Sequence, residues 1–320
     1  MSVVYFLVQQ TMTFSIPLLI VALGGMFSER GGIVNIALEG IMVIGAFAGI
    51  LFIYTVQANK LGLSGQALLI TALIISAAAG GLISLSHAYA SINMKADQVI
   101  SGTAINMFAA AFAIYVARSI RTVQQVPFTN EFRLEDVPVL GAIPVLGPLL
   151  FQKTYVTAYI GFIILAISAL VLYKTRFGLR LRSCGEHPQA ADSVGINVYK
   201  MRYAGVFISG VLAGIGGLVF VVPSSTEFNA TVSGYGFLAL AVLIFGQWKP
   251  LRILFAAFFF GLLKAMAASY SGMSFMQNVP IPSNAYKMMP YAVTLIVLAF
   301  SSKKSQAPRA EGIPYDKGNR

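Results

Sequence analysis

The sequence predicts an all-α polytopic membrane protein. Of its 320 residues, 57% are hydrophobic and 10% are charged, whereas soluble domains carry about 25% charged residues. The apolar residues follow one another in runs near the length of about 20 residues that a helix needs to cross a bilayer. The Lys and Arg residues lie mostly between these runs. We therefore expect one membrane domain over residues 1–302 and a polar tail over residues 303–320, with no separate soluble domain.

About nine apolar runs are predicted to be membrane spans. They are Tyr5–Phe27, Ile33–Tyr54, Gln66–His87, Val99–Arg118, Tyr155–Tyr173, Tyr203–Val222, Tyr235–Trp248, Ile253–Ser271 and Tyr286–Phe300. The run Tyr235–Trp248 is short for a full crossing. It indicates either half of a broken helix or a span that begins further back, through Gly234.

The basic residues predict the orientation of the chain. Residues 174–202 and the tail carry the strongest clusters of Lys and Arg, and such clusters favour the cytoplasmic side. Nine spans then place the N-terminus outside and the C-terminus inside. The loop 122–154 falls outside; its four prolines predict irregular, extended backbone. The net charge of +11 therefore reflects topology rather than nucleic-acid binding, and the tail is expected to be flexible.

Several kinds of chemistry find no support in the sequence. One cysteine, Cys184, and two isolated histidines provide no metal-binding cluster. No GxxxxGK[ST] motif is present, so the chain lacks the loop that cradles nucleotide phosphates. We predict no enzyme, no catalytic residue, no metal and no cofactor in this chain. Any process that needs energy would draw it from a partner or from an ion gradient.

Two polar residues stand out near the start of the second span. Glu39 lies about six residues into the apolar run, where a carboxylate is costly unless it is solvated or paired. Asn35 lies four residues earlier, which on a helix is the same face. The pair predicts a polar stripe that lines a water-filled pathway. The alternative is that the helix begins later and leaves Glu39 at the interface.

Other polar residues are also candidates for a pathway. Lys264 lies within a span and either extends toward the interface or forms an ion pair with Glu39. Asn106, among small residues, either lines a pathway or bonds a neighbouring helix. The remaining candidates stand near the predicted outer ends of spans: Gln9, Gln10 and Tyr235.

The segment Arg176–Asn197 is the longest basic interruption between apolar runs. Pro188 suits the first position of a helix and Gly195 the residue beyond its end, so two helical turns are predicted over Pro188–Val194. A helix this short needs a partner surface to be stable. The alternative is a solvated loop whose arginines only maintain topology.

Two Gly-rich segments, Gly31–Gly49 and Ser233–Pro250, resemble each other weakly. In the predicted topology they cross the membrane in opposite directions, as an inverted repeat requires. Chance similarity between two Gly-rich membrane helices is the alternative.

One pattern in the basic segment resembles a known family. The sequence G-E-x-P-x-A-A-D-x-x-G-I is similar to the coupling-helix loop of ABC importer permeases. Its residues are Gly185, Glu186, Pro188, Ala190, Ala191, Asp192, Gly195 and Ile196. GGIVNIALEG at 31–40 and GYGFLALAVLIFG at 234–246 resemble the branch that carries ribose, nucleosides and branched-chain amino acids.

Within that branch, the chain most resembles the nucleoside permeases. Ribose permeases typically have Asp-Leu-Ser where this chain has Asn35-Ile36-Ala37, and branched-chain amino acid permeases usually have a histidine near Leu38. Lys264 departs from the family pattern, which has an uncharged residue there, often Asn.

The resemblance implies an inverted-repeat, type II-like permease for nucleosides, with purine nucleosides favoured, in a bacterial cytoplasmic membrane. It also implies three kinds of partner in addition to membrane lipid. These are a homologous permease in a heterodimer, ATPase subunits that bind ATP and Mg²⁺ and receive the short helix, and an extracytoplasmic substrate-binding lipoprotein. The alternatives are a ribose or other sugar permease of the same class, or an ion-coupled secondary transporter that uses Glu39.

Overall fold

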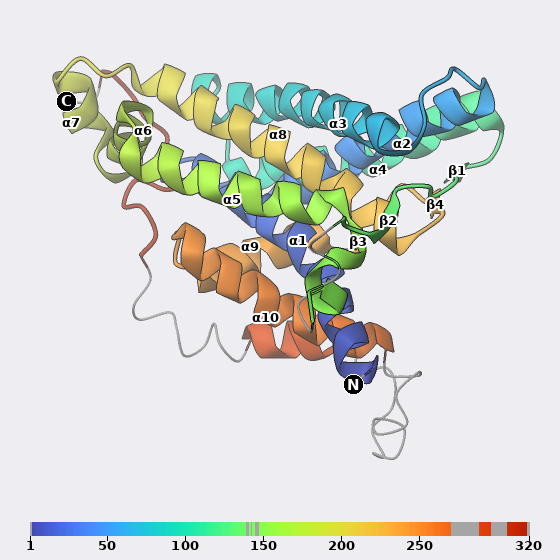
Figure 1. The fold of residues 1–320 in the computed structure, drawn as a ribbon. Helices are drawn as coiled ribbons and strands as arrows, with labels where there is room; N and C mark the ends of the chain where they lie inside the picture. The colour runs from blue at the N-terminus through green and yellow to red at the C-terminus, as the bar shows by residue number, and fades with distance from the viewer. Residues whose placement is uncertain are drawn as a thin grey trace.

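The computed structural model describes residues 2–138, 141, 143–144, 147–269, 288–295 and 306–318, and over these it is mostly helical. The predicted all-α class is confirmed. Figure 1 shows long helices running roughly side by side, with short elements gathered at both ends. The α-helices are α1 (Ser2–Arg30), α2 (Leu38–Ala58), α3 (Gly65–Ala88), α4 (Gln98–Arg121), α5 (Val156–Lys174), α6 (Arg176–Glu186), α7 (Pro188–Ser193), α8 (Val198–Ser224), α9 (Tyr235–Phe245) and α10 (Pro250–Ser269).

Within the described residues, seven helices are long and apolar enough to cross a membrane. They correspond to seven of the nine predicted spans, and the chain is a multi-pass membrane protein. They are Val4–Arg30, Leu38–Ala58, Gly65–Asn93, Gln98–Arg121, Val156–Lys174, Val198–Ser224 and Pro250–Ser269. The helix α9 has 11 residues, too few for a full crossing, as the half-helix interpretation predicts. The ninth predicted span, Tyr286–Phe300, lies mostly outside the described residues, of which 288–295 are helical.

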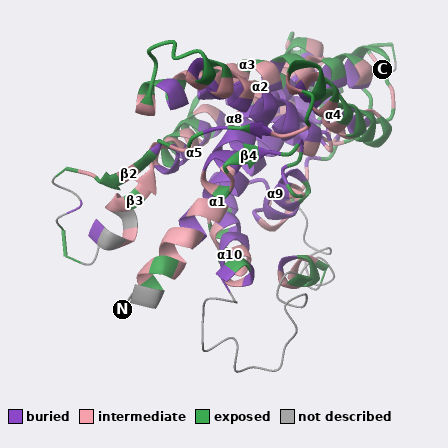
Figure 2. Cartoon of the chain, turned by 90° about the vertical axis from the view of Figure 1, so that its right-hand side faces the viewer, coloured by how far each residue is buried: buried purple, intermediate pink, exposed green. Residues whose placement is uncertain are grey.

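The helix α8 lies at the centre and packs against α1, α2 and α3. Small residues allow this packing, because the backbones approach too closely for larger side chains. A Cβ atom added to Gly214 would clash with the backbone of α3 at Ser76, and one added to Gly45 would clash with Gly214. Figure 2 shows buried residues concentrated along α1, α2 and α8, where the helices cross.

Short strands form at one end of the bundle, where the sequence predicts an irregular loop. Strands β1 (Val126–Pro127) and β4 (Glu227–Phe228) pair antiparallel, as do β2 (Arg133–Asp136) and β3 (Gln152–Tyr155). A π-helical turn, η2 (Gly147–Phe151), precedes β3, and a second, η1 (Tyr89–Asn93), follows α3. The loop 122–154 is thus more regular than its prolines suggest.

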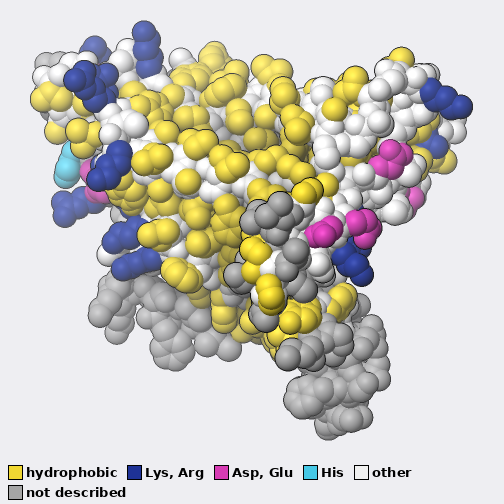
Figure 3. All heavy atoms as spheres, viewed as in Figure 1, with side chains coloured by type: hydrophobic (Ala, Val, Ile, Leu, Met, Phe, Trp, Pro, Cys, Tyr) yellow, Lys and Arg dark blue, Asp and Glu magenta, His cyan; other side chains and the backbone are white. Residues whose placement is uncertain are grey.

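The two basic segments lie together at the opposite end, as the prediction of a shared side requires. The amide of Ala310 in the tail donates a hydrogen bond to the carbonyl of Gly185 at 2.8 Å. The helix α6 occupies residues for which only a loop was predicted. Figure 3 shows Lys and Arg side chains gathered around α6 and α7, with hydrophobic side chains along the middle of the bundle.

The prediction of a flexible tail is wrong for residues 306–318. Ala310 and Tyr315 are only 6% and 5% exposed. The segment packs against α6, α8 and the connection between α1 and α2. Backbone hydrogen bonds and one aromatic side chain hold it there, and its polar composition gives no sign of either.

Candidate functional site

The connection between α1 and α2 is irregular and passes through the bundle. Side chains satisfy its backbone, as membrane-buried irregular segments require. The amide of Val34 donates to Gln98 Oε1 at 2.7 Å, and the carbonyl of Val34 lies 2.9 Å from His87 Nε2. The helix α2 begins at Leu38, so Asn35 precedes it.

The predicted polar stripe of Asn35 and Glu39 on one helical face is therefore wrong. Asn35 is fully buried and donates to Ser209 Oγ on α8 at 2.8 Å. It holds the irregular connection against α8. Glu39 lies in the first turn of α2, so the helix begins later than Ile33, as the alternative has it, while Glu39 itself is half-buried and bound to α9.

The carboxylate of Glu39 caps the N-terminus of α9. Its Oε1 accepts a hydrogen bond from Gly234 N at 2.9 Å, and its Oε2 accepts one from Gly236 N at 2.6 Å. The free amides and the dipole of a helix N-terminus favour a negative charge. A Cβ on Gly236 would clash with the Glu39 backbone, so glycine is needed for this approach. Two helix starts, α2 and α9, thus meet at one half-buried carboxylate.

The ion pair between Glu39 and Lys264, one of the two alternatives for Lys264, is not formed: the ion pairs between described residues are Arg30–Glu186 and Lys95–Asp316. The Lys264 ammonium lies 5.4 Å from the ring centroid of Tyr235 and 5.0 Å from that of Tyr291. It also donates to the Tyr291 hydroxyl at 3.3 Å. Cation–π contacts of this kind stabilise a partly desolvated ammonium. Lys264 therefore belongs to the same region as Glu39 without contacting it.

Asn106 joins α4 to the first turn of α2. Its Oδ1 accepts from Gly40 N at 2.7 Å, and its Nδ2 donates to Ile36 O at 3.0 Å. The oxygen and the nitrogen of its side-chain amide therefore both bind backbone groups at the start of α2. The structure therefore favours the helix-bonding interpretation of Asn106.

A polar pocket beside the start of α9 was not predicted as a unit. Its empty volume, which includes space open to solvent, is about 510 Å³. Its polar lining comes from the end of α8 and the segment that leads to α9: Ser224, Ser225, Glu227, Asn229, Thr231 and Ser233. The signal in the sequence is the dense run of hydroxyl and amide residues in PSSTEFNATVSG.

Tyr235 lies between this pocket and Glu39. Its side chain is 2% exposed, and its ring centroid is 4.1 Å from that of Phe220, which lines the pocket. Ser233 lines the pocket one residue before Gly234, whose amide binds Glu39. Tyr235 thus contacts the pocket residue Phe220 and stands in the chain between the two glycines whose amides bind Glu39.

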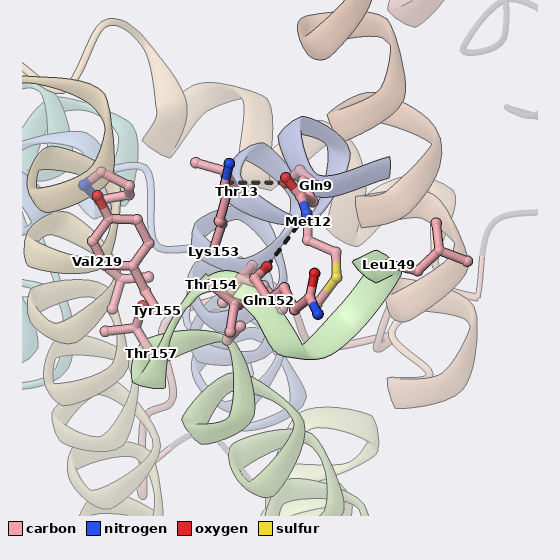
Figure 4. Close-up of a pocket in the computed structure, with 13 residues that line it drawn as sticks. Gln9, Met12, Thr13, Leu149, Gln152, Lys153, Thr154, Tyr155, Thr157 and Val219 are labelled. Carbon is pink, nitrogen blue, oxygen red and sulfur yellow. Dashed lines mark hydrogen bonds between the residues drawn. The ribbon is translucent and has the colours of Figure 1, made fainter. Parts of the chain in front are cut away.

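The predicted residues Gln9 and Gln10 lie elsewhere. Gln9 lines a separate pocket between α1, β3, α5 and α8, and its Nε2 donates to Gln152 O at 3.3 Å (Figure 4). This pocket holds about 400 Å³ of empty space. Gln10 is half-buried on the same helix and is not among the residues lining that pocket. Neither glutamine lines the pocket beside α9.

The short helix predicted in the basic segment is present as α7, Pro188–Ser193. Gly195 has φ +84°, a backbone conformation that favours glycine after a helix end. Ala191 faces inward and is 3% exposed, whereas Ala190 is exposed and Val194 is 76% exposed. The helix therefore presents one face outward, and Asp192 and Ile196 lie half-buried at its edge.

The residues before α7 attach it to the end of α1. Glu186 forms an ion pair with Arg30 at 3.8 Å. A Cβ on Gly185 would clash with the Arg30 carbonyl, so α6 rests directly on this turn. Burial raises the pKa of the Cys184 thiol. The charge of Arg202 and a hydrogen bond with Ser183 lower this pKa, but their effect is smaller. A protonated, buried thiol is a packing group rather than a nucleophile.

Comparisons with known proteins identify the chain's relatives. The model of a family described as "Branched-chain amino acid transport system / permease component" matches residues 7–298. The guanosine ABC transporter permease protein NupQ of Bacillus subtilis is 44% identical over 98% of this chain and 97% of its own length. The nucleoside ABC transporter permease protein NupC of Lactococcus lactis is 40% identical over 97% and 96%. The putative glucose ABC transporter permease protein TsgC13 of Haloferax volcanii is 28% identical over 95% and 93%.

Proposed function

Because the chain belongs to the family of branched-chain amino acid transport system permease components, we propose that it is the permease subunit of an ATP-driven nucleoside importer. One observation carries the proposal. The likeness to a guanosine permease and a nucleoside permease, at 44% and 40% identity, extends over almost the whole of each chain. The residues that match the family model, 7–298, include those of the pocket beside α9, of the Glu39 contact and of α7. Purine nucleosides are the favoured cargo.

The geometry beside α9 suits a neutral, hydroxyl-rich molecule. The pocket presents hydroxyl groups, an amide and a carboxylate, which can bond ribose hydroxyls and base edges. The charges of Glu39 and Lys264 are already stabilised by backbone amides and aromatic rings. A nucleoside passing them needs no countercharge. We propose that the pathway runs from this pocket past Tyr235 to Glu39.

The short helix α7 supplies the connection to the energy source. We assign α6, α7 and the C-terminal segment to the cytoplasm and the N-terminus to the outside of a bacterial cytoplasmic membrane. Partner ATPase subunits, which bind ATP and Mg²⁺, receive the outward face of α7. Their approach on binding ATP displaces α7 and switches the side to which the pathway opens. A homologous permease and an extracytoplasmic binding protein complete the assembly.

Uptake into vesicles tests this function. The chain is reconstituted with its partner permease, ATPase subunits and binding protein, and accumulation of labelled guanosine, ribose and glucose is measured. We expect ATP-dependent accumulation of guanosine. Accumulation of a sugar alone would favour the sugar alternative suggested by the relative described as a putative glucose permease. Accumulation driven by a pH gradient without the ATPase subunits would favour a secondary transporter.

A further inference from the structure

Residues 306–318, here named the C-terminal strap, tie together the connections at the α7 end of the bundle. Two backbone hydrogen bonds anchor its middle. Ala310 N donates to Gly185 O at 2.8 Å, and Gly312 N donates to Gly32 O at 3.1 Å. Gly185 lies in the last turn of α6, while Gly32 lies at the start of the irregular connection to α2. The strap thus bridges the segment before α7 and the segment before Glu39.

Three further contacts attach the strap to other elements. They reach the start of α8, the connection after η1 and the turn between α9 and α10. The donors and acceptors are Arg202 Nη1 to Ile313 O at 3.0 Å, Lys95 Nζ to Asp316 Oδ2 at 2.7 Å, and Gln306 N to Gln247 Oε1 at 3.0 Å. Arg202 is only 1% exposed, so its bond to the strap lies inside the protein.

Tyr315 forms part of the surface on which α7 sits. It is 5% exposed and belongs to one buried cluster with Cys184, Ala191 and Val198. Its ring packs edge-on to Tyr199 on α8, with centroids 5.5 Å apart. Because a six-residue helix does not hold its shape alone, α7 depends on this cluster for its position.

We propose that the strap fixes α7 to the α1–α2 connection, so that displacement of α7 by an ATPase subunit reaches α2 and Glu39. Tyr315 is a positioning residue that acts through α7 and touches no substrate. The inference rests on the proposed importer function. It extends that function, because the energy-coupling unit then consists of α7 together with the strap rather than α7 alone.

Two substitutions in the strap provide a matched pair. Tyr315→Ala removes the buried ring, whereas Ile313→Ala removes a side chain that is 55% exposed and leaves the carbonyl that binds Arg202. Tyr315→Phe keeps the ring in the cluster. Termination after residue 305 removes the whole strap. All are compared with the unaltered chain in the assembled complex.

Hydrogen exchange on the complex tests the strap independently of transport. Tyr315→Ala and the truncation should speed exchange of amides in both α7 and residues 31–37, while Ile313→Ala leaves both unchanged. In vesicles that contain the assembled complex, Tyr315→Ala and the truncation should lower nucleoside uptake per ATP hydrolysed by roughly fivefold or more. Fivefold corresponds to the lower end of usual coupling free energies. Tyr315→Phe should restore the ratio to near that of the unaltered chain.

Two results would contradict the proposal that the strap fixes α7. One is exchange in α7 and residues 31–37 that does not respond to Tyr315→Ala. The other is an unchanged ratio of uptake to hydrolysis after truncation. Failure of the unaltered complex to take up nucleosides with ATP would instead contradict the proposed function, and the exchange measurement would still decide whether the strap fixes α7.

Discussion

At the scale of single residues, Glu39 makes the most specific contacts along the proposed pathway. Its two carboxylate oxygens accept hydrogen bonds from Gly234 and Gly236. Glu39→Ala leaves those amides without partners, a loss of about 1–3 kcal/mol for each buried group. We expect ATP-driven uptake to fall at least roughly tenfold, since about 1.4 kcal/mol is a factor of ten. Glu39→Gln, which keeps one acceptor oxygen, should retain part of the activity.

A double substitution distinguishes this cap from an ion pair. Glu39→Gln and Lys264→Gln alter groups that bind different partners, the amides of α9 and the rings of Tyr235 and Tyr291. We expect their effects on uptake to multiply, as for residues without direct interaction. Recovery of activity in the double variant would show that the two charges compensate each other.

Glu311 in the strap predicts a pH dependence. Burial raises the pKa of its carboxyl group above the ordinary value. A hydrogen bond with Glu29 and the charge of Arg30 lower this pKa, but their effect is smaller. The folded strap therefore holds its proton more tightly than a released strap does. The resulting stabilisation is complete below the ordinary glutamate pKa and is lost as pH rises through the raised value.

Limited proteolysis of the strap at increasing pH measures this loss. Cleavage should become faster as pH rises above the ordinary pKa of glutamate, and Glu311→Gln, which stays neutral, should flatten the dependence. Asp316, whose pKa is lowered by its hydrogen bond with Lys95, contributes in the opposite direction and at lower pH. Faster cleavage on acidification alone would contradict the role of Glu311.

The sequence identified Glu39 but not its partners. An acidic residue inside an apolar run is visible in any sequence, whereas the groups that bind it are backbone amides. Their positions in the chain are 195 and 197 residues away, and no side chain marks them. Asn35 is misplaced for a related reason: the second span is predicted from Ile33, whereas Gln98 and His87 from other helices bind Val34 and the connection stays irregular up to Leu38.

At the scale of elements, the contact between α3 and α8 depends on glycine. A Cβ on Gly214 would clash with the Ser76 carbonyl, which belongs to rigid helix backbone. Gly214→Ala should lower the stability of the protein in detergent by about 1–3 kcal/mol, the usual loss from overpacking. Gly25→Ala is the control, because its Cβ would meet the flexible ends of Leu243 and Leu38. Equal thermal unfolding midpoints for the two variants would contradict this account.

The pocket beside α9 predicts a defect in cargo transfer. Asn229→Leu keeps the approximate shape of the side chain and removes its amide, so about 0.5–1.5 kcal/mol of hydrogen bonding is lost. Guanosine uptake should fall about threefold to tenfold, while ATP hydrolysis stimulated by the binding protein continues. Thr129→Val, at an exposed position outside the pocket, should change neither. A parallel fall in hydrolysis would indicate lost docking of the binding protein instead.

Prediction of the elements from sequence depended on their length. Long apolar runs and the Pro188 and Gly195 signals predict helices by strong local rules, and the described residues contain seven of the nine predicted spans as long helices, together with α7. The sequence does not predict α6, because its residues belong to the basic segment Arg176–Asn197, which lacks the long apolar run typical of the other helices. The strap was missed because its order comes from contacts with five distant parts of the chain.

At the scale of the whole molecule, the contacts of the strap and the contacts of Glu39 lie on one continuous chain segment, residues 32–39. The strap binds Gly32, and seven residues later Glu39 binds the start of α9. The irregular connection between them contains Asn35, which is fixed to α8. Movement of the α7 end could therefore reach the proposed pathway directly through this chain segment. The predicted inverted repeat and the number of nine spans stay predictions.

Cross-linking of α7 to an ATPase subunit tests the central claim most directly. Ala190→Cys places a thiol on the exposed face of α7, whereas Cys184, the only native cysteine, is buried. With a short thiol-to-amine reagent, we expect Ala190→Cys to link to the ATPase subunit and Thr129→Cys, at the other end of the bundle, to give no such product. Linkage from Thr129→Cys in place of Ala190→Cys would contradict the assignment of α7 as the ATPase contact.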